Sequence, residues 1–188
     1  MAMIPPVVRR IGLIGTYYSG TTQLILHYLH LDPDSYEPTI YDDTYSKFFM
    51  INGFPATLQI TFYRCDNDNI SRVNLYRSSI IFLCYSMADR HSFDQCRNTY
   101  HSSLERAESP IFLVATHSES LQDYSREVLQ VDGRALCDEL HFAGYYEVSV
   151  ANNEGVTELF DAAIRVIYKD RMDELIASDK QKSTCRVS

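Results

Sequence analysis

The sequence has no excess of basic residues, no paired cysteines and no long apolar run. Its 188 residues include 17 Lys and Arg against 25 Asp and Glu, a formal net charge of -8. Because phosphate backbones are held mainly by clustered Lys and Arg, this balance argues against a nucleic-acid binder. A protein or a small molecule is the better expected partner, and we expect a monomer.

The five cysteines form no C-x-x-C pair and have no nearby histidine at metal-ligand spacing. Such an odd, unpaired set is typical of a reduced, intracellular protein. The opening residues, MAMIPPVVRR, lack a signal-peptide core, and no later apolar run approaches the roughly 20 residues that cross a bilayer. We therefore expect a cytoplasmic protein whose body is soluble.

What is present fits one globular domain, since 45% of the residues are hydrophobic and can form a proper core. Short β-branched or aromatic runs predict six strands, and helix-period segments separate most of them. The strands are predicted at Val7 to Ile14, Phe48 to Ile51, Thr57 to Phe62, Ser79 to Tyr85, Ile111 to Ala115 and Tyr145 to Val150. The first and last helices are predicted at Thr22 to His30 and Val156 to Ile167. This alternation predicts an α/β fold with a mostly parallel sheet and helices on both faces.

An Asn52-Gly53 pair predicts a tight hairpin between the second and third strands, and hence one antiparallel strand. A long polar segment, Asp32 to Lys47, separates the first two strands. After about Asp170 the pattern becomes a polar tail. We therefore expect a domain over residues 1–172 and a flexible tail over residues 173–188.

The stretch GTYYSGTT, residues 15–22, follows the first apolar run, where a phosphate-binding loop would start. It keeps both glycines of G-x-x-x-x-G-K-[ST] but has Thr21 at the lysine position. YEPTI (residues 36–40), the hairpin, FLVATHSESL (residues 112–121) and EVSVANNEGVTELF (residues 147–160) follow in order. In this order and spacing the chain resembles the Ras superfamily of small GTPases over almost its whole length, and Ras and Rho members about equally. The resemblance implies the P-loop GTPase-like, three-layer G domain.

In that family the loop's N–H groups wrap the β-phosphate, the lysine bridges phosphates, and the next Ser or Thr binds Mg²⁺. A neutral threonine does not replace an ammonium there, and Tyr17 stands where a small residue is needed. The resemblance thus implies weak or absent GTP binding and no hydrolysis, with Tyr17, Tyr18 and Phe62 filling the emptied pocket. Two interpretations of the loop stay open: a weak anion site, or a turn capped by Ser19 or Thr22.

The other nucleotide motifs are also degenerate. FYRCD, residues 62–66, stands in place of D-x-x-G, THSE replaces N-K-x-D, and SVA replaces S-A-K. Thr116 lacks the carboxamide that the base-reading Asn supplies. The resemblance therefore implies no catalytic residue and a degenerate nucleotide site made of Gly15, Tyr17, Tyr18, Ser19, Gly20, Thr21, Thr22, Thr116, His117, Glu119 and Ser149.

One motif is intact, because Tyr36, Glu37, Pro38, Thr39 and Ile40 correspond to the family's effector loop. An ordinary exposed turn with Pro fixing φ is the alternative interpretation. Retention of this loop predicts a pseudo-GTPase without a cofactor that binds effector or regulator proteins, with help from residues 66–72. An atypical switch that binds GTP or GDP, with Mg²⁺ on Thr22 and Thr39, is one alternative. A scaffold subunit that binds through its helices is another.

The last residues, Cys185-Arg186-Val187-Ser188, have the form of a C-a-a-X motif, and a final Ser favours a farnesyl group on Cys185. The basic residues nearby form only a thin patch, and one lipid chain anchors marginally. We expect reversible association with the cytoplasmic face of membranes, with a plain soluble tail as the alternative. The six histidines are scattered. His27 and His30 lie on one side of the predicted first helix, where we expect surface or helix-packing roles rather than metal ligation.

Overall fold

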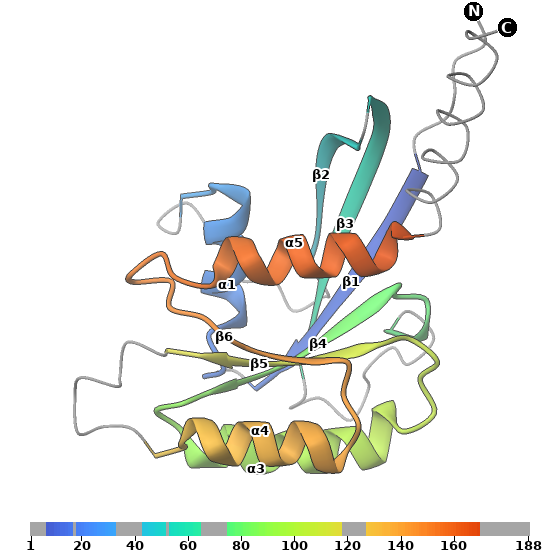
Figure 1. Ribbon diagram of the computed structural model, residues 1–188. Helices are drawn as coiled ribbons and strands as arrows, with labels where there is room; N and C mark the ends of the chain where they lie inside the picture. The colour runs from blue at the N-terminus through green and yellow to red at the C-terminus, as the bar shows by residue number, and fades with distance from the viewer. Residues whose placement is uncertain are drawn as a thin grey trace, which may run out of the picture.

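The computed structural model describes residues 7–16, 18–32, 43–51, 53–64, 75–117 and 127–169. A six-stranded sheet of order β2-β3-β1-β4-β5-β6 forms its centre (Figure 1). Its strands are β1 (Val7–Gly15), β2 (Asp43–Ile51), β3 (Phe54–Arg64), β4 (Ile80–Ser86), β5 (Ile111–Thr116) and β6 (Gly144–Glu147). Around it lie α1 (Thr21–Leu29), α3 (Arg90–Thr99), η2 (Tyr100–Leu104), α4 (Gln130–Glu139) and α5 (Val156–Ile167).

The predicted α/β architecture is confirmed. All neighbouring strands pair in parallel except β2 and β3, which are antiparallel. The pairing of Ile51 with Phe54 leaves a two-residue turn, and Gly53 has a φ of 83°, a conformation that glycine adopts without strain. The hairpin expected at this position is therefore present.

Three predicted strand bounds are wrong by three residues or more. β3 begins at Phe54 rather than Thr57, because it stays paired with β2 up to the hairpin turn. β2 begins at Asp43 rather than Phe48, so half of the strand comes from the segment that was expected to be a polar connection. The reason is that β2 lies at the sheet edge and alternates, which lets Thr44 and Ser46 point to solvent. β6 ends at Glu147 instead of Val150, because Ser149 leaves the sheet and pairs with Glu154 in an isolated bridge.

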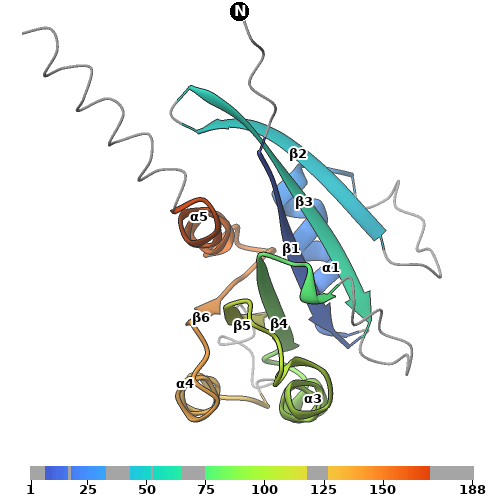
Figure 2. The same cartoon turned by 90° about the vertical axis from the view of Figure 1, so that its right-hand side faces the viewer.

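The two faces of the sheet bury separate apolar clusters (Figure 2). On one face, α1 and α5 cover the side chains of β1, β3, β4 and β5 that point toward them. On the other face, α3 and α4 cover the opposite side chains, mainly those of β4 and β5. Strand alternation assigns each residue to a face, so the continuous apolar runs of β4 and β5 supply both clusters.

The C-terminal end of α5 is tied to the three strands on the β2 side of the sheet. The Tyr168 hydroxyl donates to the carbonyl oxygen of Thr57 at 2.9 Å, and its ring meets Phe49 edge-on at 5.9 Å between centroids. Arg9 Nε donates to the carbonyl oxygen of Ile167 at 3.0 Å. The end of the helix therefore has a fixed position beside β1, β2 and β3.

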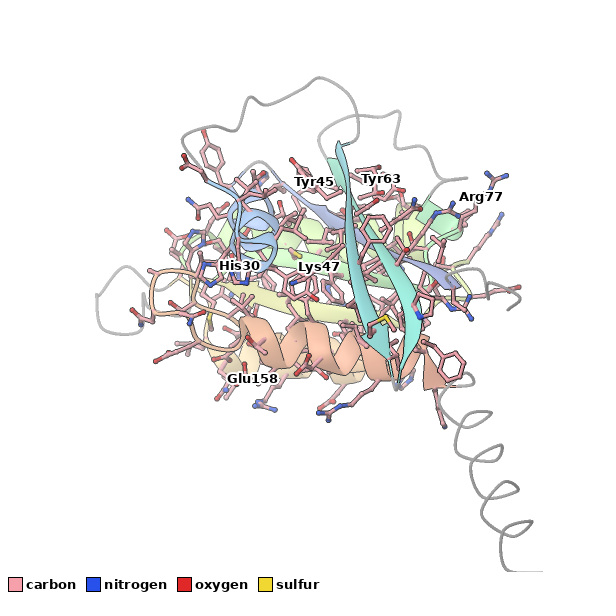
Figure 3. All side chains as sticks on the ribbon, turned by 90° about the horizontal axis from the view of Figure 1, so that it is seen from above. His30, Tyr45, Lys47, Tyr63, Arg77 and Glu158 are labelled. Atoms are coloured by element: carbon pink, nitrogen blue, oxygen red, sulfur yellow. The ribbon has the colours of Figure 1, made fainter. Side chains whose placement is uncertain are left out.

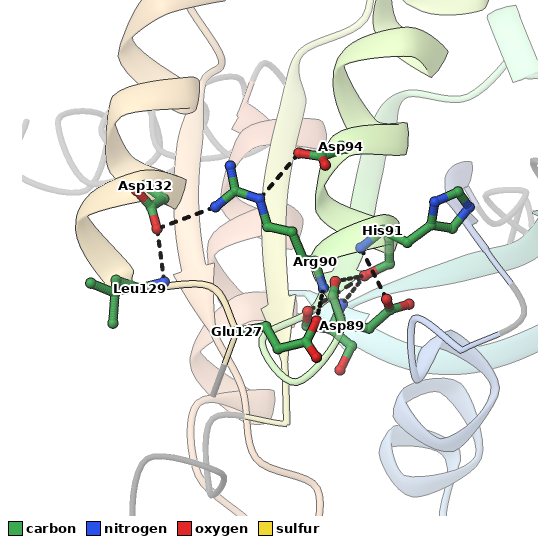
Figure 4. Close-up of polar contacts among 9 residues, drawn as sticks. Asp89, Arg90, His91, Asp94, Glu127, Leu129 and Asp132 are labelled. Atoms are coloured by element: carbon green, nitrogen blue, oxygen red, sulfur yellow. Dashed lines mark hydrogen bonds and ion pairs between the residues drawn. The ribbon is translucent and has the colours of Figure 1, made fainter. Parts of the chain in front are cut away.

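Polar contacts join the N-terminal ends of α3 and α4 (Figure 4). The Asp132 carboxylate accepts from the Leu129 N–H at 3.0 Å and lies 3.8 Å from the Arg90 guanidinium. Glu127 accepts from the backbone N–H of Arg90 at 2.7 Å. This end of the molecule therefore presents several carboxylates. No helix in the described ranges is long and apolar enough to cross a membrane.

Gly133 lets α4 approach the buried phenol of Tyr85 and the half-buried phenol of Tyr145. The hydroxyls of Tyr85 and Tyr145 lie 3.3 Å apart, and Tyr145 also donates to Glu147 at 2.8 Å. Burial is the main cause that raises the pKa of Tyr145, so its hydroxyl stays protonated and can donate. A Cβ at Gly133 would lie 2.4 Å from the Tyr85 hydroxyl and 2.6 Å from the Tyr145 ring.

We expect Gly133→Ala to lower the free energy of unfolding by about 1–3 kcal/mol, because overpacking of this site outweighs the roughly 1 kcal/mol by which Ala is the better helix former. Denaturant unfolding measures the change. Asp138→Ala, at an exposed position of the same helix, is the matched control and should change stability little. A stabilised Gly133→Ala protein would contradict the packing described for the two tyrosines.

Candidate functional site

The segment between β1 and α1 is a turn that closes on itself. The backbone N–H of Ser19 donates to the carbonyl oxygen of Thr16 at 3.1 Å, and the Ser19 hydroxyl donates to the same oxygen at 2.7 Å. The Ser19 and Thr21 hydroxyls lie 3.3 Å apart, and both residues are buried. The donors of Ser19 therefore point into the loop and bond to it.

Two glycines make this tight turn possible. A Cβ at Gly15 would lie 2.3 Å from the Ser19 hydroxyl. Gly20 is the N-cap of α1 with a φ of 70°, and no side chain caps the helix. The alternative with Ser19 or Thr22 as the cap is therefore wrong, because the hydroxyl of Ser19 is used inside the loop and Gly20 occupies the cap position.

The Thr116 hydroxyl, at the C-terminal end of β5, connects this loop to the sheet. Its Oγ1 lies 2.8 Å from the carbonyl oxygen of Ser19 and 3.1 Å from that of Tyr85. Both oxygens only accept, so the single hydroxyl proton is used by one of them. His117 Nδ1 lies 3.1 Å from the same Oγ1 and 3.0 Å from the Ser86 hydroxyl. The Thr116 hydroxyl therefore links the loop, at Ser19, to the sheet, at Tyr85.

A cavity of about 520 Å³ lies beside Thr116. Its walls come from α1, the end of β5 and the segment after β6. The lining residues are Gly20, Gln23, His27, His30, Leu31, Thr116, His117, Val150 and Ala151. Three imidazoles thus face one cavity, and none of these lining residues is a carboxylate, a lysine or an arginine.

His27 is also held by a contact across the cavity rim, because its Nε2 lies 2.8 Å from Asn153 Oδ1. His30 ends α1 with a φ of 55°, and His117 has a φ of 56°. These left-handed conformations are uncommon for residues other than glycine. They occur where the chain changes direction, His30 at the end of α1 and His117 directly after β5. No group of three or more His, Cys, Asp or Glu side chains suited to a metal ion occurs among the residues that the structure describes.

The structure brings together only part of the predicted nucleotide site. Gly20, Thr116 and His117 line the cavity, whereas Ser19 and Thr21 lie in the closed turn. Gly15 lies directly under this turn, and Thr22 is half-buried on α1. Ser149 is fully buried, and its hydroxyl accepts from the Asn152 N–H at 3.0 Å. Ser149 therefore stabilises the turn after β6 instead of lining the cavity.

The expectation that tyrosines and Phe62 fill the emptied pocket is wrong for the two of these residues that can be placed. Tyr18 is 73% exposed, and Phe62 points by strand alternation into the apolar cluster under α1 and α5. Tyr17, Glu119, residues 36–40 with Thr39, residues 65–74 and Cys185 lie outside the described residues.

This region has two parts in which a nucleoside triphosphate with Mg²⁺ would have to bind: the cavity, for the base, and the loop between β1 and α1, for the phosphates. The cavity has room for a base, and His117 and Thr116 stand at its wall. The phosphate half does not fit, because the lysine position holds the buried Thr21 and the Ser19 N–H is already bonded to Thr16.

The sequence reasoning missed the lining residues that carry no motif, namely Gln23, Leu31, Val150 and Ala151 as cavity walls. It placed His27 and His30 on one side of the first helix, which is the side that faces the cavity. The only available signal was that spacing, and helical periodicity does not tell a cavity wall from a packed face.

Comparisons with known proteins agree with this geometry. The sequence model of the Ras family matches residues 10–169. The Rho-related GTP-binding protein RhoH of Mus musculus is 26% identical over 162 residues, covering 81% of this chain and 84% of the relative. RhoH of Bos taurus is 25% identical over the same shares. The Ras-like GTP-binding protein RhoL of Drosophila melanogaster is 22% identical over 165 residues, covering 85% and 87%.

Members of the Ras family bind GTP or GDP with Mg²⁺ and act on effectors and regulators. The match runs from within β1 through α5, and the relatives named above are Rho-related or Ras-like GTP-binding proteins at low identity. The chain belongs to the Ras family of small GTPases, as a divergent, Rho-like member.

Proposed function

We propose that this chain is a signalling protein that has lost, or strongly weakened, GTP binding and hydrolysis and acts by binding partner proteins. The closed loop after β1 is the observation that carries the proposal. In the family this loop donates its N–H groups to the β-phosphate. Here the Ser19 N–H donates to Thr16 at 3.1 Å, and the Thr116 hydroxyl holds the Ser19 carbonyl at 2.8 Å.

Opening this loop for a phosphate would break hydrogen bonds that are already satisfied. The missing lysine removes the charge-assisted contact that would compensate, and such contacts are about twice as strong as neutral ones. Thr21, in its place, is only 1% exposed. The closed form is therefore favoured over a phosphate-bound form.

Partner binding is assigned to the switch I-like residues Tyr36 to Ile40, with residues 66–72 beside them. The elements on either side of residues 33–42, α1 and β2, contact each other directly (Figure 3). Lys47 Nζ of β2 lies 3.9 Å from the Tyr28 ring centroid of α1 and donates to the Tyr28 carbonyl oxygen at 3.1 Å. The Tyr28 ring stacks on Phe160 of α5 at 3.6 Å. This contact supports a partner-binding loop whose flanks are fixed by packing.

We also assign a farnesyl group to Cys185 and reversible, lipid-anchored association with the cytoplasmic face of membranes. The C-a-a-X form of the last four residues supports this assignment. One lipid chain gives marginal binding, so a second contact with the bilayer would strengthen it.

The second candidate function is an atypical GTP-binding switch with weak GTPase activity. The cavity of about 520 Å³ beside Thr116 and His117 favours it, because a base would have a place to bind. The two candidates differ in whether nucleotide binding stabilises the protein.

Thermal unfolding with GTP, GDP or ATP and Mg²⁺ separates them. We expect no shift in melting temperature with any of these nucleotides. A ligand at 100 times its Kd would add about 2.7 kcal/mol of stability, a change that is easily measured. A Mg²⁺-dependent shift with GTP but not with ATP would sink the pseudo-GTPase proposal and establish the switch.

A pair of threonine variants tests the link that the Thr116 hydroxyl makes between the loop and the sheet. Thr116→Val removes the buried hydroxyl between the carbonyl oxygens of Ser19 and Tyr85 and takes away the hydrogen bond that it donates to one of them, so we expect a loss of about 1–3 kcal/mol of stability. Thr16→Val is the matched control, because the Thr16 hydroxyl is buried and bonds no residue that the structure describes. Its change should be neutral or stabilising. Equal losses in denaturant unfolding would contradict the role given to Thr116.

Glu37→Lys and Thr39→Ala test the partner-binding loop. We expect both to reduce the capture of partner proteins by roughly tenfold or more, as for central interface residues. Quantitative mass spectrometry of captured proteins with and without Mg²⁺-GTP measures this, and Glu158→Lys on the exposed face of α5 is the control. If capture survives every substitution from Tyr36 to Ile40, the loop is not the binding surface. A loss confined to the Glu158→Lys protein favours a scaffold that binds through its helices.

A further inference from the structure

One face of the strands β1, β2 and β3 exposes large apolar side chains in cross-strand rows. Phe48 and Val8 lie on either side of Thr57, and Met50 is paired with Pro55. Phe48 is 77% exposed, Met50 63% and Val8 44%. Contiguous apolar surface of this kind marks an interaction site more often than scattered single residues do.

No described helix covers this face. The alternate residues of the same strands, such as Phe49 and Leu58, pack under α1 and α5 on the other side. The helices α3 and α4 cover β4 and β5, and Figure 2 shows the β2–β3 ribbon extending away from both. We call this surface, made of Val8, Arg10, Phe48, Met50 and Pro55, the hairpin face.

The hairpin face lacks negative charge in a strongly acidic protein. Residues 7–16 and 44–63 contain no Asp or Glu, although 30 residues at the chain's average would carry about four. Arg10 is exposed, and its Nε donates to the neutral side-chain amide of Gln59 at 2.9 Å. Arg9 lies one residue away, at the end of α5. A surface with exposed apolar and basic residues and no acidic ones is complementary to an anionic bilayer, which has negative headgroups over an apolar interior.

The continuation of the chain toward Cys185 leaves from the same end of the molecule. Tyr168 bonds the carbonyl oxygen of Thr57, the residue that lies between Phe48 and Val8 on the sheet. Lys169 follows and is exposed. Fifteen residues lie between it and Cys185, and even fully extended this segment spans at most about 58 Å. A lipid on Cys185 would therefore keep the hairpin face close to a bilayer.

We propose that the hairpin face is a membrane-contact surface that docks on an anionic bilayer, with Phe48 and Met50 entering the headgroup region and Arg10 meeting lipid phosphates. The proposal rests on the membrane association proposed above and supplies its second contact. A single lipid chain binds marginally, and a few apolar and basic contacts make such binding stable. An acidic protein partner would bind the arginines but would leave the apolar rows without a matching surface.

The chain contains no tryptophan, so Phe48→Trp introduces a single fluorescent reporter on the hairpin face. The full chain carries an added C-terminal histidine tag and is tethered to vesicles of phosphatidylcholine and phosphatidylserine with a nickel-chelating lipid. This tether makes the result independent of whether Cys185 is modified. We expect a blue shift of the emission maximum on tethering, and quenching when the vesicles contain brominated lipid.

Val131→Trp is the matched control. Val131 is 65% exposed on α4, at the end of the molecule where Asp132 and Glu127 gather, and its emission should not change. Equal shifts and quenching in both proteins, or none in the Phe48→Trp protein, would overturn the proposal. A Phe48→Trp shift that depends on protein concentration and needs no vesicle would assign the face to a second copy of the chain and also overturn it.

Affinity for the same vesicles without the chelating lipid supplies the second measurement. Exposed residues are changed, so the variants should fold, and thermal unfolding checks that they do. We expect Phe48→Ser and Met50→Ser each to weaken partitioning by roughly tenfold. Arg10→Gln should weaken it roughly fivefold, with a smaller dependence on salt. Unchanged partitioning in all three would also overturn the proposal.

The outcomes separate this proposal from the proposed function. An unmodified Cys185 in an intact-mass spectrum from eukaryotic expression would remove the lipid anchor but not the tethered result. A nucleotide-dependent melting shift would remove the pseudo-GTPase without affecting the hairpin face.

Discussion

The parallel pairing of β1 with both β3 and β4 is the constraint on which the other features depend. It places Gly15 beside Arg64 and Cys84 at one end of the strand, and Val7 beside Ala56 at the other. Each end of β1 therefore has its own environment. The closed loop and the cavity lie at the C-terminal end, and the apolar and basic hairpin face lies at the N-terminal end. Because the residues between are buried, neither end moves without disturbing the core.

At the C-terminal end, part of the loop that would hold a phosphate in a family member is bonded by the protein itself. The Ser19 N–H bonds within its own turn, and Thr116 holds that turn against β5. Thr16 is the exception, since its hydroxyl is buried without a partner among the described residues. The bonds of Ser19 and Thr116 favour the closed form of the loop. A cavity lies beside it, lined by residues from α1, the end of β5 and the segment after β6.

Much of the fold could be predicted from the sequence. Apolar runs and helix periodicity located β1, β4, β5, α1 and α5 closely, and the Asn52-Gly53 pair predicted the hairpin. The beginning of β2 was missed because Thr44 and Ser46 are polar on the solvent side of an edge strand, where polarity does not distinguish a strand from a loop. The end of β6 was missed because Val148 and Val150 suggest a strand, whereas the pairing of Ser149 with Glu154 is a contact that periodicity does not encode.

The candidate site was predicted in part. Thr116 and His117 were found because they stand at motif positions, but their joining of the loop to the sheet depends on tertiary distances. The cavity histidines come from distant parts of the chain, since 86 residues lie between His30 and His117. No local sequence pattern relates them. The exposed position of Tyr18 was not predictable either, because a motif gives the place of a residue in the loop but not the direction of its side chain.

The uneven placement of acidic residues also has a consequence at long range. The strands beside the hairpin contain only basic charges over residues 7–16 and 44–63, whereas the ends of α3 and α4 carry Asp94, Glu127 and Asp132. Among the described residues, basic charge therefore gathers near the hairpin face and acidic charge at the ends of α3 and α4, although the chain's net charge is -8. Near the negatively charged bilayer proposed above, this difference would turn the protein before any atom touches, within a Debye length of about 8 Å at physiological salt. Orientation would thus come first and insertion second, and the protein would meet the bilayer with one side already selected.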